Sequence, residues 1–98
     1  MTADLSAIRI DKLLWFLRLA PSRGDARDAA EAGHVRINGR RIERASAAVH
    51  VGDVLVLPLR GAVRVIAITA IPLRRGPASE AQSCYRVVDH TDSEPGQA

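Results

Sequence analysis

The chain has 98 residues, of which 47% are hydrophobic and 26% are charged, as is typical of one globular domain. This length leaves no room for a catalytic domain with an appended binding module, and the composition excludes a fully disordered chain. The net charge is +3, from 14 Lys and Arg against 11 Asp and Glu, which weakly favours a polyanionic partner.

The positive charge is concentrated in the first half of the chain. Residues 9–44 contain nine basic and five acidic side chains, whereas residues 45–98 contain five of each. Thirteen of the 14 basic residues are Arg, whose planar guanidinium suits bidentate phosphate contacts. A genome rich in Arg codons would explain part of the Arg:Lys ratio, but it does not explain the clustering.

Several classes of protein leave no signature in the sequence. The single cysteine, Cys84, cannot form an intrachain disulfide and fits a reducing cytoplasm. The three histidines lack the spacing of metal ligands, and the motifs of a phosphate-binding loop and of a nucleophilic serine are absent. The start does not resemble a signal peptide, and the longest apolar stretch, residues 65–73, is too short to cross a membrane. We therefore expect a cytoplasmic, non-catalytic protein with no cofactor, metal, small-molecule substrate or membrane contact.

A first helix is predicted from about Lys12 to Leu19 or Ala20. Asp11 is a suitable N-cap, because its carboxylate can accept amide hydrogens of the first turn, and Pro21 ends the helix.

The apolar residues of this helix are expected to form core. Leu14 and Leu17 share a face and are expected to be buried with Ile10. For Trp15 and Phe16, packing is favoured over contact with a ligand.

A second helix is predicted to begin after Ser22, with Asp25 in the capping-box position, and to end at Gly33. Its buried face is mostly alanine. Arg23 and Arg27 lie four residues apart and share a face near the positively polarised N-terminus, which favours a phosphate site. The alternative is a solvated face on which Arg27 pairs with Glu31.

A tight hairpin is predicted around Asn38-Gly39, the strongest short signal for such a turn. It projects Arg36, Arg40 and Arg41 beside the second helix. Alone, such a tip is often a charged edge that discourages aggregation. Together with Arg23 and Arg27 it predicts a concave basic surface.

Strands dominate the rest of the chain. Residues 47–51 alternate before a Gly52-Asp53 turn, a strand over 54–57 is broken by Pro58 and Arg60-Gly61, and another over 63–71 is ended by Pro72. A basic loop at 73–77 precedes a capped helical turn at 78–81, and residues 85–88 fit either a helix end or a closing strand.

The predicted fold class is therefore α+β, a compact motif of two helices and a β-hairpin followed by a small, mainly antiparallel sheet. One domain is expected over 8–89, with a core motif at about 8–57. An N-terminal segment, 1–7, precedes it, and a disordered tail, 90–98, follows it.

The order and spacing of several short strings resemble the RNA-binding domain named after ribosomal small-subunit protein S-four, over residues 8–57. The strings are Arg9-Ile10-Asp11-Lys12, Ser22-Arg23, Gly33-His34-Val35-Arg36-Ile37-Asn38-Gly39 and Val51-Gly52-Asp53. Arg74-Arg75-Gly76-Pro77-Ala78-Ser79-Glu80-Ala81 is similar, more narrowly, to the ribosome-associated heat-shock protein fifteen family. In that family the proteins often continue into a basic C-terminal extension, whereas residues 90–98 here are acidic to neutral.

The resemblance implies a bacterial protein that binds structured ribosomal RNA on the large subunit, in a stress-linked or subunit-recycling role. It assigns RNA contact to nine residues: Arg9, Lys12, Ser22, Arg23, Arg27, Arg36, Asn38, Arg40 and Arg41.

The aromatic content is only 3%, so we expect contacts with phosphates and RNA shape and few stacked bases. Two alternatives remain: a targeting module that acts with a separate RNA-modifying enzyme, and a protein-interaction regulator. A monomer is expected.

Overall fold

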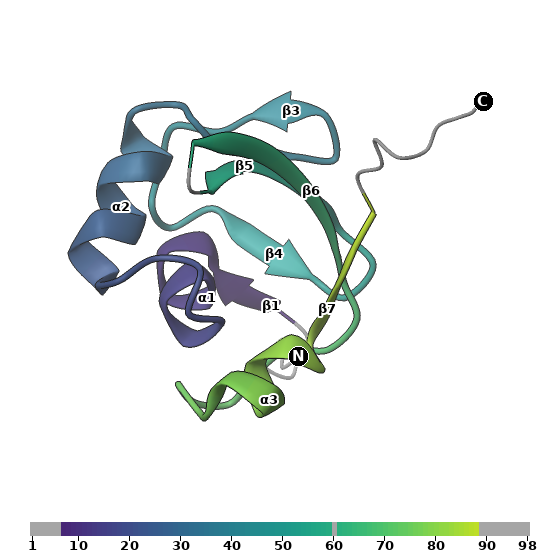
Figure 1. The fold of residues 1–98 in the computed structure, drawn as a ribbon. Helices are drawn as coiled ribbons and strands as arrows, with labels where there is room; N and C mark the ends of the chain where they lie inside the picture. The colour runs from purple at the N-terminus through teal and green to yellow at the C-terminus, as the bar shows by residue number, and fades with distance from the viewer. Residues whose placement is uncertain (1–6, 60, 89–98) are drawn as a thin grey trace, which may run out of the picture.

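The computed structural model describes residues 7–59 and 61–88, which fold into three short helices and two antiparallel sheets (Figure 1). The elements in chain order are β1 (Ala7–Arg9), α1 (Ile10–Phe16), α2 (Arg23–Glu31), β2 (Arg36–Ile37), β3 (Arg40–Arg41), β4 (Ala48–His50), β5 (Val54–Leu59), β6 (Ala62–Ile68), α3 (Ala78–Gln82) and β7 (Tyr85–Val87). The predicted α+β class is confirmed. No helix in the described ranges is both long and apolar enough to cross a membrane.

The larger sheet has the strand order β3-β2-β5-β6-β7, and β1 pairs with β4 in a separate two-stranded sheet. The helices lie to one side of the large sheet (Figure 1). The core fills the space between them, with fully buried residues from α1, from the strands and from the connection after α2: Ile10, Leu13, Leu17, Val35, Val49, Leu55, Ile66 and Ile68. Ala26 and Ala30 of α2 are also buried, as predicted, and their small side chains let α2 pack closely on α1.

The boundaries predicted for the first helix are wrong at both ends. Helix α1 begins at Ile10 because two of its first amide groups find partners in the loop before β4. The Ile10 N–H donates to Ala47 O at 2.8 Å, and the Asp11 N–H donates to Ala45 O at 3.2 Å. Asp11 therefore lies inside the first turn and is not the N-cap. The helix ends at Phe16, before Pro21, and Arg18 adopts a left-handed conformation with φ 61°.

The two aromatic residues of α1 pack as expected, but outside the main core cluster. Leu14 and Leu17 join Ile10 in the main core cluster, as predicted. Phe16 is buried and Trp15 is half-buried, but neither belongs to that cluster. Their rings instead contact each other, with centres 5.8 Å apart.

The second helix and the hairpin agree with the sequence prediction. Ser22 Oγ accepts the Asp25 N–H at 3.0 Å at the start of α2, and Gly33 follows the helix with φ 79°. Asn38 and Gly39 both have positive φ, 53° and 83°, the conformation of the two-residue turn that suits the twist of a hairpin.

Three predictions for the second half need correction. Pro58 does not break strand β5. The N–H that a proline lacks would point toward the β2 side of β5, and β2 pairs only with Leu55 and Val56, so no hydrogen bond of the sheet is lost at Pro58. Strand β6 ends at Ile68, not at Ile71. Helix α3 has no side-chain cap, since Pro77 occupies the N-cap position.

Residues 85–87 form the closing strand β7. The predicted tail 90–98 and Arg60 lie outside the described residues, as does the predicted N-terminal segment except for Ala7, which belongs to β1.

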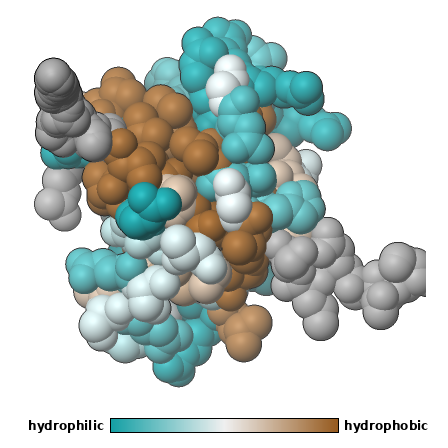
Figure 2. All heavy atoms as spheres, turned by 90° about the vertical axis from the view of Figure 1, so that its right-hand side faces the viewer, coloured by the Kyte–Doolittle hydropathy of each residue, from teal (hydrophilic) through white to brown (hydrophobic). Residues whose placement is uncertain are grey.

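The outer face of β5 and β6, turned away from the helices, is apolar. Because side chains alternate along a strand, the residues beside buried Leu55 and Ile66 point outward: Val54, Val56, Val63, Val65 and Ala67. Figure 2 looks at the molecule from this side and shows apolar residues gathered on part of the surface with hydrophilic residues around them.

Candidate nucleic-acid interface

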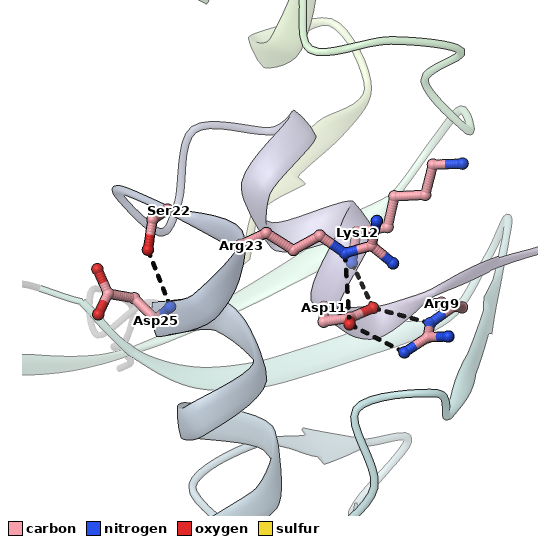
Figure 3. Close-up of polar contacts among 6 residues, drawn as sticks. All are labelled: Arg9, Asp11, Lys12, Ser22, Arg23 and Asp25. Carbon is pink, nitrogen blue, oxygen red and sulfur yellow. Dashed lines mark hydrogen bonds and ion pairs between the residues drawn. The ribbon is translucent and has the colours of Figure 1, made fainter.

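A buried carboxylate joins basic side chains where α1 and α2 begin. Asp11 is 2% exposed. The Arg9 guanidinium donates two hydrogen bonds to the Asp11 carboxylate, from Nε to Oδ1 at 3.1 Å and from Nη2 to Oδ2 at 3.0 Å. Arg23 Nε lies 3.5 Å from the same Oδ2 (Figure 3). The side chains of Arg9 and Arg23 remain 50% and 43% exposed. Asp11 therefore anchors two arginines whose outer parts face solvent.

The Asp11 carboxyl is held in its charged form. Burial alone would raise its pKa, but hydrogen bonds from Arg9 and from the Lys12 N–H, together with the positive charge of Arg23, lower the pKa below the usual 3.8. The carboxylate is thus a fixed negative charge at the first turn of α1, where the helix dipole also favours it.

Lys12 follows Asp11 in α1 and is half-buried, and Ser22 precedes Arg23 at the start of α2 and is exposed. In Figure 3 the Lys12 side chain extends away from Asp11. The Ser22 hydroxyl accepts the Asp25 N–H at 3.0 Å, which leaves its own O–H free to donate. The cluster of Arg9, Lys12 and Arg23 around Asp11 carries three positive charges against one negative charge.

Helix α2 leads from this cluster toward the hairpin. Arg27 follows Arg23 by one turn and is exposed. The alternative pairing with Glu31 does not occur, since within the described ranges Arg27 makes no ion pair or hydrogen bond. At the far end, the Arg41 guanidinium covers Gly33, where an added Cβ would lie 3.0 Å from Arg41 Nε. The hairpin therefore does lie beside the second helix.

The three hairpin arginines do not point in one direction. Arg36 is paired with Arg41 across the hairpin and Ile37 with Arg40, so Arg36 and Arg41 share one face and Arg40 lies on the face of Ile37. Arg41 also forms an ion pair with the exposed Glu43. Arg41 is the one whose side chain contacts the end of α2, at Gly33.

Asn38 serves the turn itself. Its Nδ2 donates to Asp53 Oδ1 at 3.0 Å and its Oδ1 accepts the Val54 N–H at 2.9 Å. Asp53 Oδ2 in turn accepts the His50 N–H at 2.8 Å. The amide of Asn38 thus ties the hairpin to the turn between β4 and β5, and both of its polar atoms already have partners.

Sequence reasoning missed two acidic anchors. Asp11 was expected to cap a helix and Asp53 to form a turn, whereas each connects segments that are distant in the chain. Both residues lie in the short strings that resemble the RNA-binding domain, and these strings were the signal in the sequence that could have indicated their role. No three His, Cys, Asp or Glu side chains in the described part of the chain gather into a group that could hold a metal ion.

Comparison with known proteins identifies the family. Residues 8–55 match the S4 domain. The chain is 37% identical to heat shock protein 15 of Escherichia coli strain K12 over 78 residues, which cover 80% of this chain and 58% of that protein. It is 33% identical over 67 residues to small ribosomal subunit protein uS4 of Kosmotoga olearia, covering 68% of this chain and 32% of that protein.

The fold is similar to a solved structure as well. The trimeric structure of Vibrio cholerae heat shock protein 15 superposes with a TM-score of 0.79 at 35% identity, covering 84% of this chain and 82% of that one. The chain spans less than two thirds of the length of the Escherichia coli protein that it matches. With an S4 domain match in its first half and this similarity in sequence and fold, the chain belongs to the heat shock protein 15 family of RNA-binding proteins.

Proposed function

We propose that this protein binds structured ribosomal RNA without catalysing a reaction, in the cytoplasm and on the large ribosomal subunit, in a stress-linked or subunit-recycling role. The observation that carries the proposal is the Asp11 cluster, in which one buried carboxylate orients Arg9 and Arg23 beside Lys12. Membership of an RNA-binding family supports the ligand class.

The geometry of the cluster suits phosphate. Arg23 Nε lies 3.5 Å from Asp11 Oδ2, and within the described residues the terminal amino groups of Arg23 donate no hydrogen bond, so both are available for a bidentate contact. Arg9 uses Nε and Nη2 on Asp11 and keeps its other terminal amino group. Since the arginines are already oriented, phosphate binding immobilises fewer side-chain rotamers than it would at a free arginine.

Arg27 extends this site along α2, and Arg41 extends it to the hairpin. With about six phosphate contacts, the logarithm of RNA affinity should fall against the logarithm of salt with a slope near −4 to −5. The binding affinity of a protein-interaction regulator would hardly depend on salt concentration. The salt dependence therefore distinguishes RNA binding from protein binding.

Co-sedimentation with separated ribosomal subunits at low and moderate salt tests the proposal. We expect salt-sensitive association with the large subunit that is lost in Arg23→Glu/Arg27→Glu. Arg27→Glu and Arg86→Glu form a matched pair, since each reverses one exposed charge, and only the first should weaken binding. Failure of the wild-type protein to associate with either subunit would contradict the ribosomal assignment.

The monomeric state is also a proposal, and two observations point the other way. The Vibrio cholerae relative is trimeric, and the outer face of the large sheet here exposes Val63 by 64%, which a second copy could cover. Light scattering across a range of protein concentrations distinguishes a monomer from a trimer.

A further inference from the structure

Two cations and two aromatic rings form a continuous row along α1. Lys12 Nζ lies 5.4 Å from the centre of the Phe16 ring, and the Phe16 and Trp15 ring centres are 5.8 Å apart. Arg75 Cζ lies 5.7 Å from the centre of the Trp15 ring. The row of Lys12, Phe16, Trp15 and Arg75 thus starts beside the Asp11 cluster and ends on a segment sixty residues further along the chain.

The Arg75 side chain is fixed in this position. Its Nε donates to the Trp15 carbonyl at 3.1 Å, so the guanidinium both lies over the Trp15 ring and is hydrogen-bonded to the end of α1. Arg18 holds the same loop from the other side, with Nε donating to Gly76 O at 2.8 Å. The loop is therefore docked on the end of α1.

The two adjacent arginines of this loop differ in charge balance. Arg74 is neutralised by Glu80, which it contacts with Nη2–Oε1 at 2.8 Å and Nε–Oε2 at 3.2 Å. Within residues 7–59 and 61–88 no carboxylate pairs with Arg75. Arg75 thus retains a full positive charge and two terminal amino groups that have no partner in this part of the chain.

We propose that this row extends the RNA-binding surface beyond the S4 domain match, which ends at residue 55. Arg75 binds an RNA phosphate through its terminal amino groups, and the half-buried Trp15 ring contacts the adjacent ribose or base. The inference rests on the proposed function and adds a further contact to it, at the opposite end of α1 from the Asp11 cluster. It also gives the aromatic pair a binding role as well as a packing role.

The matched variants for the test are Arg75→Ala and Arg74→Ala, because each removes one positive charge from the same loop. The probe is deproteinised large-subunit ribosomal RNA refolded with Mg²⁺, and binding is measured by anisotropy of the fluorescently labelled protein at several salt concentrations. We expect Arg75→Ala to weaken binding about fivefold to tenfold and to reduce the salt slope by roughly 0.7 to 0.9, as for one lost phosphate contact. Arg74→Ala should weaken binding less than twofold.

Trp15 supplies an independent signal, because it is the only tryptophan in the chain. Its emission should change when RNA binds the wild-type protein. Thermal unfolding of each variant checks the fold, and Arg75→Gln, which keeps the aliphatic stem and one donor, replaces Arg75→Ala if the alanine variant unfolds.

The outcomes separate the two proposals. If the RNA binds, but Trp15 emission is unchanged and Arg75→Ala binds as tightly as Arg74→Ala, the row is not part of the RNA surface and the proposed function stands. If both variants weaken binding equally, net charge explains the effect and the contact at Arg75 is refuted. If the wild-type protein does not bind this RNA, both proposals fail.

Discussion

The two arginine-rich regions, the Asp11 cluster and the β2–β3 hairpin, organise their charges in opposite ways. In the cluster, Arg9 and Arg23 come from different elements and share one buried carboxylate. In the hairpin, Arg41 pairs with an exposed glutamate, and Arg36 and Arg40 pair with no carboxylate among the described residues. The cluster therefore fixes its cations in place, whereas the hairpin fixes its backbone and leaves most of its cations free. Orientation, and not the number of arginines, should decide how much each region contributes to binding.

The largest effect is expected from removing the anchor. Asp11→Ala should lower the free energy of unfolding by about 2 kcal/mol, because the variant loses charge-assisted hydrogen bonds and leaves the Lys12 N–H without its partner. Urea denaturation followed by circular dichroism measures the loss. Glu43→Ala, which breaks the exposed pair with Arg41, should cost about 0–1 kcal/mol. Equal losses in the two variants would show that Asp11 is not a special anchor.

The second effect concerns RNA affinity. Arg23→Ala should weaken binding about tenfold, equivalent to about 1.4 kcal/mol, because it removes an oriented guanidinium. Arg40→Ala, on the other face of the hairpin, should weaken binding about threefold or less. Both variants lose one positive charge, so the ratio of their dissociation constants at one salt concentration measures the effect of where the charge lies. A larger loss in Arg40→Ala would reverse the comparison between the two regions.

The third effect tests what stabilises the hairpin. Asn38→Ala should destabilise the protein by about 1–2 kcal/mol, since alanine is strained at a φ of 53° and both amide hydrogen bonds are lost. Asn38→Gly loses the same hydrogen bonds without the strain, so it should be the more stable variant. Thermal unfolding of the pair measures the difference, and identical midpoints would mean that the backbone conformation contributes nothing.

The smallest effect is a pH dependence. Because the pKa of Asp11 is lowered in the folded state, its contribution to stability is complete above the usual value of 3.8 and is lost as the pH falls through the folded value. Between pH 5 and 8 the Asp11 carboxyl should therefore cause no change in the free energy of unfolding. Below about pH 4, the free energy of unfolding of Asp11→Asn should fall less steeply than that of the wild type.

Glu80 shifts in the same direction, because its hydrogen bond with Arg74 lowers its pKa. Glu80→Gln is therefore the control for acid unfolding. If the loss of stability at low pH is unchanged in Asp11→Asn but becomes smaller in Glu80→Gln, the pH dependence belongs to Glu80.

Local features were predictable from the sequence. The Ser22 cap, the turn at Asn38-Gly39 and the glycine after α2 each depend on residues that are neighbours in the chain. The start of α1 was not predictable, because its first amide groups bind carbonyls of Ala45 and Ala47. Residue types alone favoured Asp11 as a cap, and only the folded chain brings Arg23 to it.

The same limit applies to the candidate site. The sequence indicated which arginines belong to the motif, and the structure places Arg9, Lys12 and Arg23 together. It could not indicate that Arg40 lies on the opposite face of the hairpin from Arg41, since this follows from pairing register. Nor could it indicate the contact of Arg75 with Trp15, which joins residues sixty positions apart.

The position of β5 has a consequence for how the protein folds. The S4 match ends at residue 55, inside this strand, and β5 lies between β2 and β6 in the sheet. Leu55 shares the core with Ile66 and Ile68, which come from beyond the match. The motif and the downstream strands should therefore unfold as one cooperative unit, with amide protons of α1 and β6 exchanging at the same free energy of opening. We therefore expect that the end of the family match is not a boundary of folding, and that the helices of the proposed RNA site depend for their stability on strands that need never touch RNA.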